Sequence, residues 1–280
     1  MAERRAYDVA IVGAGIAGSA LAVALSGEGH RVVLVEARSV EPTALPSELG
    51  LAHFDPRVSA LTPASIAFLD ALGAWEAIAQ YRCCPYRHMT VWDGDGTATI
   101  DFDAAEVDAQ SLGTIVENRV ITNSLVDRLH AQGTTTVLAP ASLASCEPDA
   151  QGSVKLTLED GTELDAALLV AADGALSRVR QLMDFRTREW DYGHRAIVTT
   201  VQCDTSHRDT AWQCFMPTGP LALLPLPSAP ESHFVSIVWS QEEEAADRLL
   251  ALDDRAFCDA LSQASAVSYT HLTLPTTSRG

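Results

Sequence analysis

The residues best suited to chemistry lie near the N-terminus, in a glycine-rich turn. Residues 8–18 read DVAIVGAGIAG, an apolar strand that leads into the spacing Gly-x-Gly-x-x-Gly. Gly13 permits a tight turn, Gly15 lets a phosphate approach the backbone, and Gly18 lets a helix pack closely on the strand. The N-terminus of that helix offers unpaired N–H groups and a positive dipole end to an anion. The stretch therefore predicts a binding site for the pyrophosphate of a dinucleotide.

Glu36 completes this pattern, because it follows a second apolar run at 31–35. The end of that run is the carboxyl edge of the next parallel strand, beside the glycine turn. Glu36 lies 18 residues after Gly18. This is close to the spacing of about 20 expected for a carboxylate that holds a ribose hydroxyl. Strand, helix, second strand and acid together predict a dinucleotide site, which the glycines alone would not do.

A secretory signal peptide is the alternative for the same stretch. Arg4 and Arg5 precede an apolar run from Ala10 to Leu25, as in the basic and apolar regions of a signal. The density of glycine and the strand that follows disfavour this alternative, and no cleavage site stands clear of the helix.

The composition is that of a globular protein that does not bind nucleic acid. The chain has 280 residues, 47% hydrophobic and 20% charged, and a formal net charge of −18. This charge disfavours contact with phosphate backbones and gives no attraction to anionic lipid. No apolar stretch is long enough to cross a bilayer. The six cysteines form neither a Cys-x-x-Cys pair nor a metal-like spacing with histidine, so we expect reduced thiols in a cytoplasmic protein.

Helices and strands alternate around the glycine turn and then give way to longer strands. A helix capped by Thr62 or Ser65 is predicted, with core-facing residues at helical spacing: Ile66, Leu69, Leu72 and Trp75. Residues 168–172 are continuously apolar, as in a strand buried on both faces. Other expected elements are a hairpin at 88–102, a helix at 118–131, strands at 134–138, 153–159, 195–202, 211–217, 219–225 and 233–240, and a charged helical segment at 242–264.

Five blocks of sequence resemble one family. They are the glycine turn with Glu36, and the stretches 56–61 (PRVSAL) with 72–75 (LGAW), 116–121 (VENRVI), 172–180 (ADGALSRVR), and 219–226 (GPLALLPL) with 238–239. Over residues 6–264 the chain resembles the flavin-dependent aromatic hydroxylases of ubiquinone biosynthesis, within the single-component flavoprotein monooxygenases. The resemblance implies an α/β fold: a Rossmann-like FAD-binding domain with an inserted, mainly antiparallel β-sheet substrate domain.

The resemblance also implies that the cofactor is FAD and which residues hold it. The glycine turn and Glu36 match the part that holds the ADP half, and Arg38 is included with them. Arg57 and Asn118 match contacts to the flavin, and the Asp-Gly block matches a contact to the pyrophosphate and NAD(P)H, with Arg180 in its helix. The complete set is Gly13, Gly15, Gly18, Glu36, Arg38, Arg57, Asn118, Asp173 and Gly174.

The later assignments have structural alternatives. Arg57 could form a surface ion pair. Asp173 could cap the helix that follows it, and Asn118 could cap the helix that it opens. Glu117 and Arg119, which flank Asn118, are expected to face solvent.

The reaction implied by the resemblance is a monooxygenation. FAD carries the redox chemistry, NAD(P)H is the co-substrate, and O₂ supplies the hydroxyl group added to the ring of a polyprenylated phenol or benzoquinol. The stretches 82–87 and 211–215 favour slightly the branch that acts on the methoxy-methyl-benzoquinol ring. No catalytic residue or metal ligand is assigned, because no Ser-His-Asp arrangement, acid pair or metal motif stands out. The apolar strands over 195–240 could line a site for the polyprenyl tail or simply form the core of the sheet.

Location and partners follow from the same resemblance. The expected location is cytoplasmic. Peripheral association with the inner membrane, or with a multi-enzyme biosynthetic complex, is an open alternative.

The predicted FAD-binding domain is discontinuous, over 1–76 and 105–185, and the substrate domain occupies 77–104 and 186–265. Family members continue to a Gly-Asp block that nothing after position 174 matches. The last residues, 266–280, resemble a translated sequencing adapter, so we expect a C-terminally truncated chain with a non-native tail. Such a fragment is expected to bind FAD weakly and to be inactive.

Two other functions stay open. A flavin-dependent reductase or dehydrogenase could use the same scaffold, although the blocks at 116–121 and 219–226 favour the hydroxylase. The fragment could also be non-enzymatic, either inert or a scaffold subunit of a biosynthetic assembly. Uptake of O₂ separates the first two functions, and flavin content separates both from the third.

Overall fold

The chain forms two compact units in a computed structural model that describes residues 5–150, 152–230, 233–265 and 272–273. The first unit comprises 1–44, 68–77 and 119–189, and the second comprises 45–67, 78–118 and 190–280. Residues 45–67 and 105–118 thus group with the second unit, which differs from the predicted boundaries. The reason is strand pairing, since β3 (Val58–Leu61) and β4 (Cys84–Tyr86) both pair with β7 (Gly113–Glu117). Apart from 272–273, the predicted tail lies outside the described residues.

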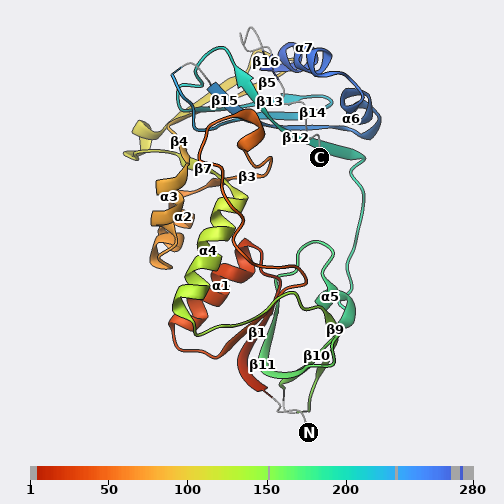
Figure 1. The fold of residues 1–280 in the computed structure, drawn as a ribbon. Coiled ribbons are helices and arrows are strands. Elements are labelled where there is room, and N and C mark those ends of the chain that lie inside the picture. Colours follow the sequence, from red (N-terminus) through yellow and green to blue (C-terminus); the bar gives the residue numbers. More distant parts are fainter. Residues whose placement is uncertain (1–4, 151, 231–232, 266–271, 274–280) are drawn as a thin grey trace. The chain divides into compact units, whose positions relative to one another are not determined.

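The first unit is built on a six-stranded sheet in the order β8-β2-β1-β11-β10-β9. Its strands are β1 (Arg5–Val12), β2 (Val32–Val35), β8 (Thr136–Leu138), β9 (Leu143–Pro148), β10 (Val154–Leu158) and β11 (Glu163–Ala171). The strands β8, β2, β1 and β11 pair in parallel. β10 pairs antiparallel with β11 on one side and with β9 on the other. Helices α1 (Ile16–Gly27) and α4 (Asn118–Gln132) lie side by side (Figure 1), and the Ser26 hydroxyl of α1 donates to Gln132 Oε1 of α4 at 3.0 Å. This is the Rossmann-like part of the predicted fold.

The prediction that 168–172 is buried on both faces is wrong. β10 pairs with β11 only over 163–166, so the end of β11 extends past it and pairs, among the described residues, with β1 alone. Leu168 is consequently 54% exposed. An apolar run shows that a strand can be buried, but its neighbours decide whether it is.

The helix predicted over Leu72 is also two helices, α2 (Pro63–Ala71) and α3 (Trp75–Tyr81). Gly73 separates them, with φ at +70°, a backbone conformation that favours glycine at the end of a helix. Of the residues in α2, Leu69 is buried. The core-facing stripe is therefore confirmed at one position and interrupted by the turn.

The second unit is built on a seven-stranded sheet in the order β16-β12-β15-β14-β13-β5-β6. Its strands are β5 (His88–Asp93), β6 (Thr99–Asp103), β12 (His194–Cys203), β13 (Thr210–Met216), β14 (Gly219–Pro225), β15 (His233–Glu242) and β16 (Leu272–Thr273). Every pairing is antiparallel except that of β13 with β5, so the mainly antiparallel sheet is confirmed.

Two helices cover one face of this sheet, α6 (Glu243–Leu250) and α7 (Asp254–Ser265) (Figure 1). The rings of Trp239 in β15 and Phe257 in α7 pack edge to face, with centroids 6.1 Å apart. The segment 242–264 is helical, as predicted, and forms two helices, because Asp253 begins a new one by accepting a hydrogen bond from the Ala256 N–H. Short 3₁₀ turns occur at η1 (Leu51–His53) and η2 (Ala104–Val107), and α5 spans Arg178–Leu182.

Candidate functional site

The glycine turn lies at the edge of the parallel sheet where β1, β2 and β11 end. The Gly13 N–H donates to the Val35 carbonyl at the end of β2, at 2.8 Å, and the Ala172 N–H donates to the Val12 carbonyl at 2.7 Å. The ends of all three strands are therefore joined by backbone hydrogen bonds around the turn. Such a carboxyl edge is where ligands bind in open α/β sheets. We call it the glycine edge: residues 13–18, Glu36, Asp173 and Gly174.

The three glycines of the turn have different surroundings. Gly13 has φ at +104°, and a Cβ there would lie 2.4 Å from the Ala172 carbonyl oxygen. A Cβ on Gly18 would lie 1.9 Å from the Gly13 carbonyl oxygen, whereas one on Gly15 would meet nothing within 4 Å. The turn and packing roles predicted for Gly13 and Gly18 are confirmed. The open space at Gly15 suits a bound phosphate, and that role stays a prediction.

The Glu36 carboxylate is held against the turn by two backbone donors. Oε2 accepts from the Ala14 N–H at 2.8 Å, and Oε1 accepts from the Arg38 N–H at 3.0 Å. A carboxylate oxygen can accept more than one hydrogen bond, so both oxygens can still receive a ribose hydroxyl. Arg38 thus positions Glu36 through its main chain, while its side chain is exposed.

Asp173 lies directly after β11 and fastens the start of α5. Its two carboxylate oxygens accept hydrogen bonds from the Ser177 hydroxyl at 2.6 Å and from the Arg178 and Val179 N–H groups at 2.6 and 3.1 Å. Asp173 therefore accepts from the first N–H groups of α5, although the N-cap residue of that helix is Ser177, whose hydroxyl accepts from the Arg180 N–H. A cofactor role for Asp173 and the exposed Gly174 stays a prediction. Arg180 also acts locally, because its Nη2 donates to the Ala175 carbonyl at 2.6 Å.

Arg57 and Asn118 belong to the second unit and lie next to each other. The Asn118 N–H donates to the Arg57 carbonyl at 2.9 Å, and Asn118 Oδ1 accepts from the Ser59 hydroxyl at 2.6 Å. The Arg57 side chain is exposed, and it makes no ion pair with any residue that the structure describes. The surface ion pair proposed as its alternative role therefore has no partner there.

Glu117 does not face solvent, which corrects the sequence prediction. Its side chain is 3% exposed and pairs with Arg82, whose side chain is 7% exposed, with 2.7 Å between Oε1 and Nε. The two residues lie 35 positions apart and come together because β4, which begins shortly after Arg82, pairs with β7, which ends at Glu117. A glutamate that ends an apolar strand is a weak signal of burial, and nothing in the sequence identifies its partner.

One further cluster brings together Cys84, His207 and Asp209, whose potential ligand atoms lie within 4.8 Å of one another. His207 Nδ1 accepts from the Asp209 N–H at 3.1 Å, which leaves Nε2–H to donate to the Leu226 carbonyl at 2.9 Å. Burial, with smaller contributions from Asp209 and Cys83, raises the pKa of the Cys84 thiol to about 12. Both ring nitrogens are occupied and the thiol is protonated. The His207 ring connects the loop before β13 to Leu226, the residue after β14.

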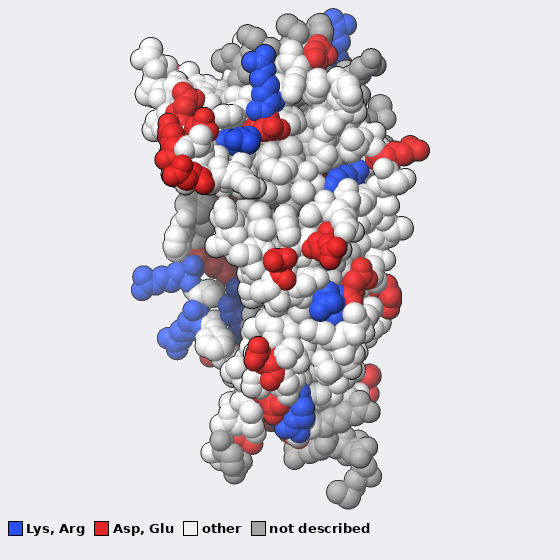
Figure 2. Space-filling view, turned by 90° about the vertical axis from the view of Figure 1, so that its left-hand side faces the viewer, with Lys and Arg blue, Asp and Glu red and all other residues white. Residues whose placement is uncertain are grey.

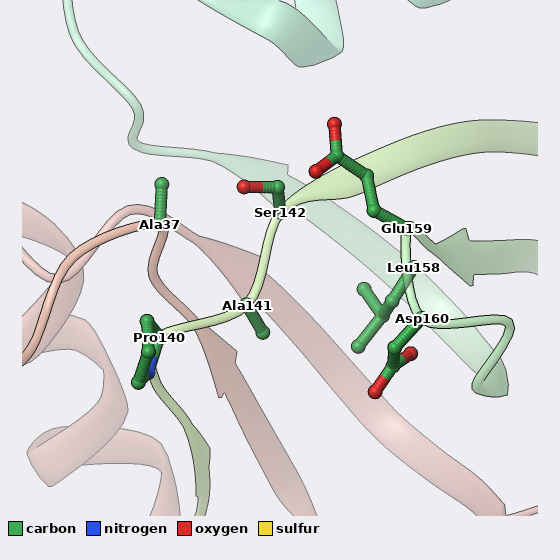
Figure 3. A pocket seen from close by; sticks show the side chains of 7 residues that line it. All are labelled: Ala37, Pro140, Ala141, Ser142, Leu158, Glu159 and Asp160. Carbon is green, nitrogen blue, oxygen red and sulfur yellow. The ribbon is translucent and has the colours of Figure 1, made fainter.

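A small pocket opens beside the strand end that carries Glu36 (Figure 3). The Ala141 N–H donates to the Glu36 carbonyl at 2.7 Å, which places the pocket next to the glycine edge. The pocket offers hydroxyl and carboxylate acceptors near Glu36 rather than a cationic surface. Its lining residues are Ala37, Pro140, Ala141, Ser142, Leu158, Glu159 and Asp160.

Figure 2 shows one face of the molecule, where acidic and basic side chains are scattered over a larger neutral surface. None of the helices in the described residues combines the length and apolarity needed to cross a bilayer.

Comparison with known proteins identifies the family. The protein family described as "FAD binding domain" matches residues 6–277 of this chain. The chain belongs to the FAD binding domain family. The glycine edge is compatible with that cofactor, because the space beside Gly15 is open and the Glu36 carboxylate is fixed against the turn.

The curated relatives of this FAD binding domain include enzymes named for ubiquinone biosynthesis. The chain is 36% identical over 272 residues to the ubiquinone biosynthesis monooxygenase COQ6 of Xenopus tropicalis, covering 92% of this chain and 56% of that protein. It is 37% identical over 234 residues to the 3-demethoxyubiquinol 3-hydroxylase of Escherichia coli, covering 83% of this chain and 56% of that protein. The chain thus spans about half the length of these relatives.

Solved structures show the same fold. PqsL of Pseudomonas aeruginosa in complex with 2-aminobenzoylacetate superposes with a TM-score of 0.76 at 23% identity, covering 93% of this chain and 67% of that one. HpxO of Klebsiella pneumoniae, complexed with FAD, superposes with a TM-score of 0.65 at 20% identity, covering 93% and 63%. The Rossmann-like domain with an antiparallel partner sheet is therefore confirmed.

Proposed function

We propose that this chain carries the FAD-binding and substrate parts of a monooxygenase that hydroxylates the ring of a polyprenylated phenol or benzoquinol in ubiquinone biosynthesis. The observation that carries the proposal is the glycine edge, in a chain whose relatives are named for that pathway. NAD(P)H and O₂ are the proposed co-substrates.

Each part of the proposed cofactor site has a distinct task. Bound FAD would supply hydride acceptance from NAD(P)H and the activation of O₂. The turn around Gly15 would hold the pyrophosphate with backbone N–H groups and the N-terminus of α1, and Glu36 would bind ribose hydroxyls. Arg57 and Asn118 would contact the flavin half, for which Arg57 offers an exposed cation without a competing ion pair among the described residues.

The substrate would meet the face of the seven-stranded sheet opposite α6 and α7. Side chains alternate along each strand, and those of Ile197, Leu221 and Trp239 pack on the helix side. The opposite face carries a row of half-buried, mostly apolar side chains in cross-strand register: Val198, Val238, Ala222, Gln213 and Val91. Such a row suits an aromatic ring or a prenyl tail, with one amide available for hydrogen bonding.

Turnover with a prenylated phenol tests this proposal. Consumption of NAD(P)H and O₂ in equal amounts, with one ¹⁸O atom from labelled O₂ in the product by mass spectrometry, is the expected result. NAD(P)H oxidation without O₂ uptake would instead indicate a reductase. A chain that neither binds FAD nor turns over would support the non-enzymatic alternative.

The proposal includes peripheral association with the inner membrane, because a polyprenylated substrate partitions into the bilayer. Sedimentation with neutral vesicles that contain a polyprenylated quinone tests it. The expected result is greater binding than to the same vesicles without the quinone.

A further inference from the structure

We propose that Arg82 and Glu117 are positioning residues for the flavin half of the cofactor site. Their buried ion pair holds segment 45–57, which ends in Arg57, against the start of α4, which carries Asn118. The inference rests on the proposed function, because it takes Arg57 and Asn118 as contacts to FAD. No catalytic role is assigned to either member of the pair.

The Arg82 guanidinium, in the residue after α3, uses one nitrogen for Glu117 and two for segment 45–57. Nε pairs with Glu117, Nη1 donates to the Glu48 carbonyl at 3.2 Å, and Nη2 donates to the His53 carbonyl at 2.6 Å. Its carbon Cζ lies 4.7 Å from the centroid of the Phe54 ring. One side chain therefore fixes the main chain of the segment at two points and stacks on the aromatic ring of the residue after the second point.

The Glu117 carboxylate extends this connection to the predicted flavin contacts. Its Oε2 accepts from the Asp55 N–H at 2.6 Å, and Asp55 Oδ1 in turn accepts from the Arg57 N–H at 3.0 Å. The residue after Glu117 is Asn118, whose N–H donates to the Arg57 carbonyl. The carboxylate thus acts on Arg57 through Asp55 and on Asn118 through its own backbone.

The burial of this pair indicates orientation rather than stability as its role. Replacing a buried ion pair by apolar residues of similar size is often neutral or stabilising, because the desolvation cost of two charges is removed. Apolar side chains could not, however, hold the backbone groups of Glu48, His53 and Asp55 in place. These directed hydrogen bonds are what the charged pair adds to the second unit.

Paired substitutions separate orientation from folding. Arg82→Met with Glu117→Leu removes both charges, so the chain should fold with a melting temperature near that of the wild type. We expect FAD to bind at least tenfold more weakly, measured by quenching of flavin fluorescence, and the amides of 45–57 to exchange with deuterium at least tenfold faster. Arg82→Met with Glu117→Gln keeps an acceptor for the Asp55 N–H and should restore part of both properties.

A matched control is the exposed ion pair of Arg195 with Asp247 in the same unit. Arg195→Met with Asp247→Asn should change neither FAD binding nor exchange at 45–57. The inference is overturned if the Met/Leu variant matches the wild type in both measurements, or if the control loses as much. If the wild-type chain binds no FAD, the proposed function fails, and the exchange measurement alone then decides whether the pair holds the segment.

Discussion

The glycine edge of the first unit and the Arg82–Glu117 pair of the second each hold a loop in place, the first by backbone contacts and the second by side-chain charges. The glycine edge is held by backbone atoms, with Gly13 and Gly18 in contacts that leave no room for a Cβ. The Arg82–Glu117 pair holds a loop by side-chain charges that are almost fully buried. An added side-chain atom would overlap the backbone at Gly13 and Gly18. Loss of either member of the Arg82–Glu117 pair would leave the other charge buried without a partner.

This difference indicates which kind of substitution should destabilise each region. At the glycine edge, substitution should act through steric overlap and strained backbone conformation. At the buried pair, it should act through an unpaired charge. The following predictions test that contrast, beginning with the largest effect.

Arg82→Met alone should reduce the free energy of unfolding by about 3–5 kcal/mol, because it leaves the Glu117 carboxylate buried without its cation. Urea denaturation monitored by circular dichroism measures it. The matched change Arg195→Met removes an exposed cation and should cost at most about 1 kcal/mol. Equal losses in the two variants would remove the contrast between buried and exposed pairs.

Gly18→Ala should cost about 1–3 kcal/mol, although alanine favours helices, because its Cβ would overlap the Gly13 carbonyl oxygen. The overlapping atom belongs to the backbone, so no side-chain rotation relieves it. Thermal unfolding measures the loss. A variant as stable as the wild type would show that the turn can move and that the edge is not closed by backbone contact.

Gly15→Ala should leave folding nearly intact, with a change in the free energy of unfolding below about 1 kcal/mol, because a Cβ there meets open space. FAD binding should weaken about tenfold, or roughly 1.4 kcal/mol, since the methyl group would occupy the space proposed for the phosphates. Flavin fluorescence titration measures it. Unchanged affinity would place the pyrophosphate elsewhere.

His207 gives the second unit a pH-dependent stability. Burial lowers the pKa of His207 from 6.5, and its Nδ1 accepts a hydrogen bond only when unprotonated. The unfolded chain therefore takes up a proton before the folded chain does, so stability should hold above about pH 6.5 and fall below it. Melting temperatures between about pH 7 and pH 5 measure this, and His207→Gln should flatten the curve. An equally steep curve in the variant would assign the effect to other groups.

Arg31→Met should have the smallest effect on stability. Arg31 and Asp8 form an ion pair at 2.8 Å with side chains 65% and 38% exposed. Hydrogen bonds from Arg31 lower the pKa of Asp8 to about 2, and the variant should return it toward 3.8, as measured by NMR titration. The melting temperature should not change detectably, because exposed ion pairs contribute little. A large decrease in the melting temperature would show that an exposed ion pair can contribute as much to stability as the buried Arg82–Glu117 pair.

Local spacing was sufficient to predict the glycine turn and Glu36 from the sequence. The positions of Gly13, Gly15, Gly18 and Glu36 each follow from backbone geometry over a single strand, helix and strand. The order of elements and the antiparallel sheet followed from the same kind of short-range pattern. These features depend on residues that are neighbours in sequence or lie one element apart.

Only the tertiary structure decided how charges and apolar strands are covered. Glu117 was predicted to face solvent and is buried, because its partner Arg82 comes from a different element and reaches it through folding of the second unit. Leu168 was predicted to be buried and is exposed, because β10 ends before it. The burial of a residue depends on which distant residues folding places beside it. The geometry of a glycine turn is instead determined by its own backbone.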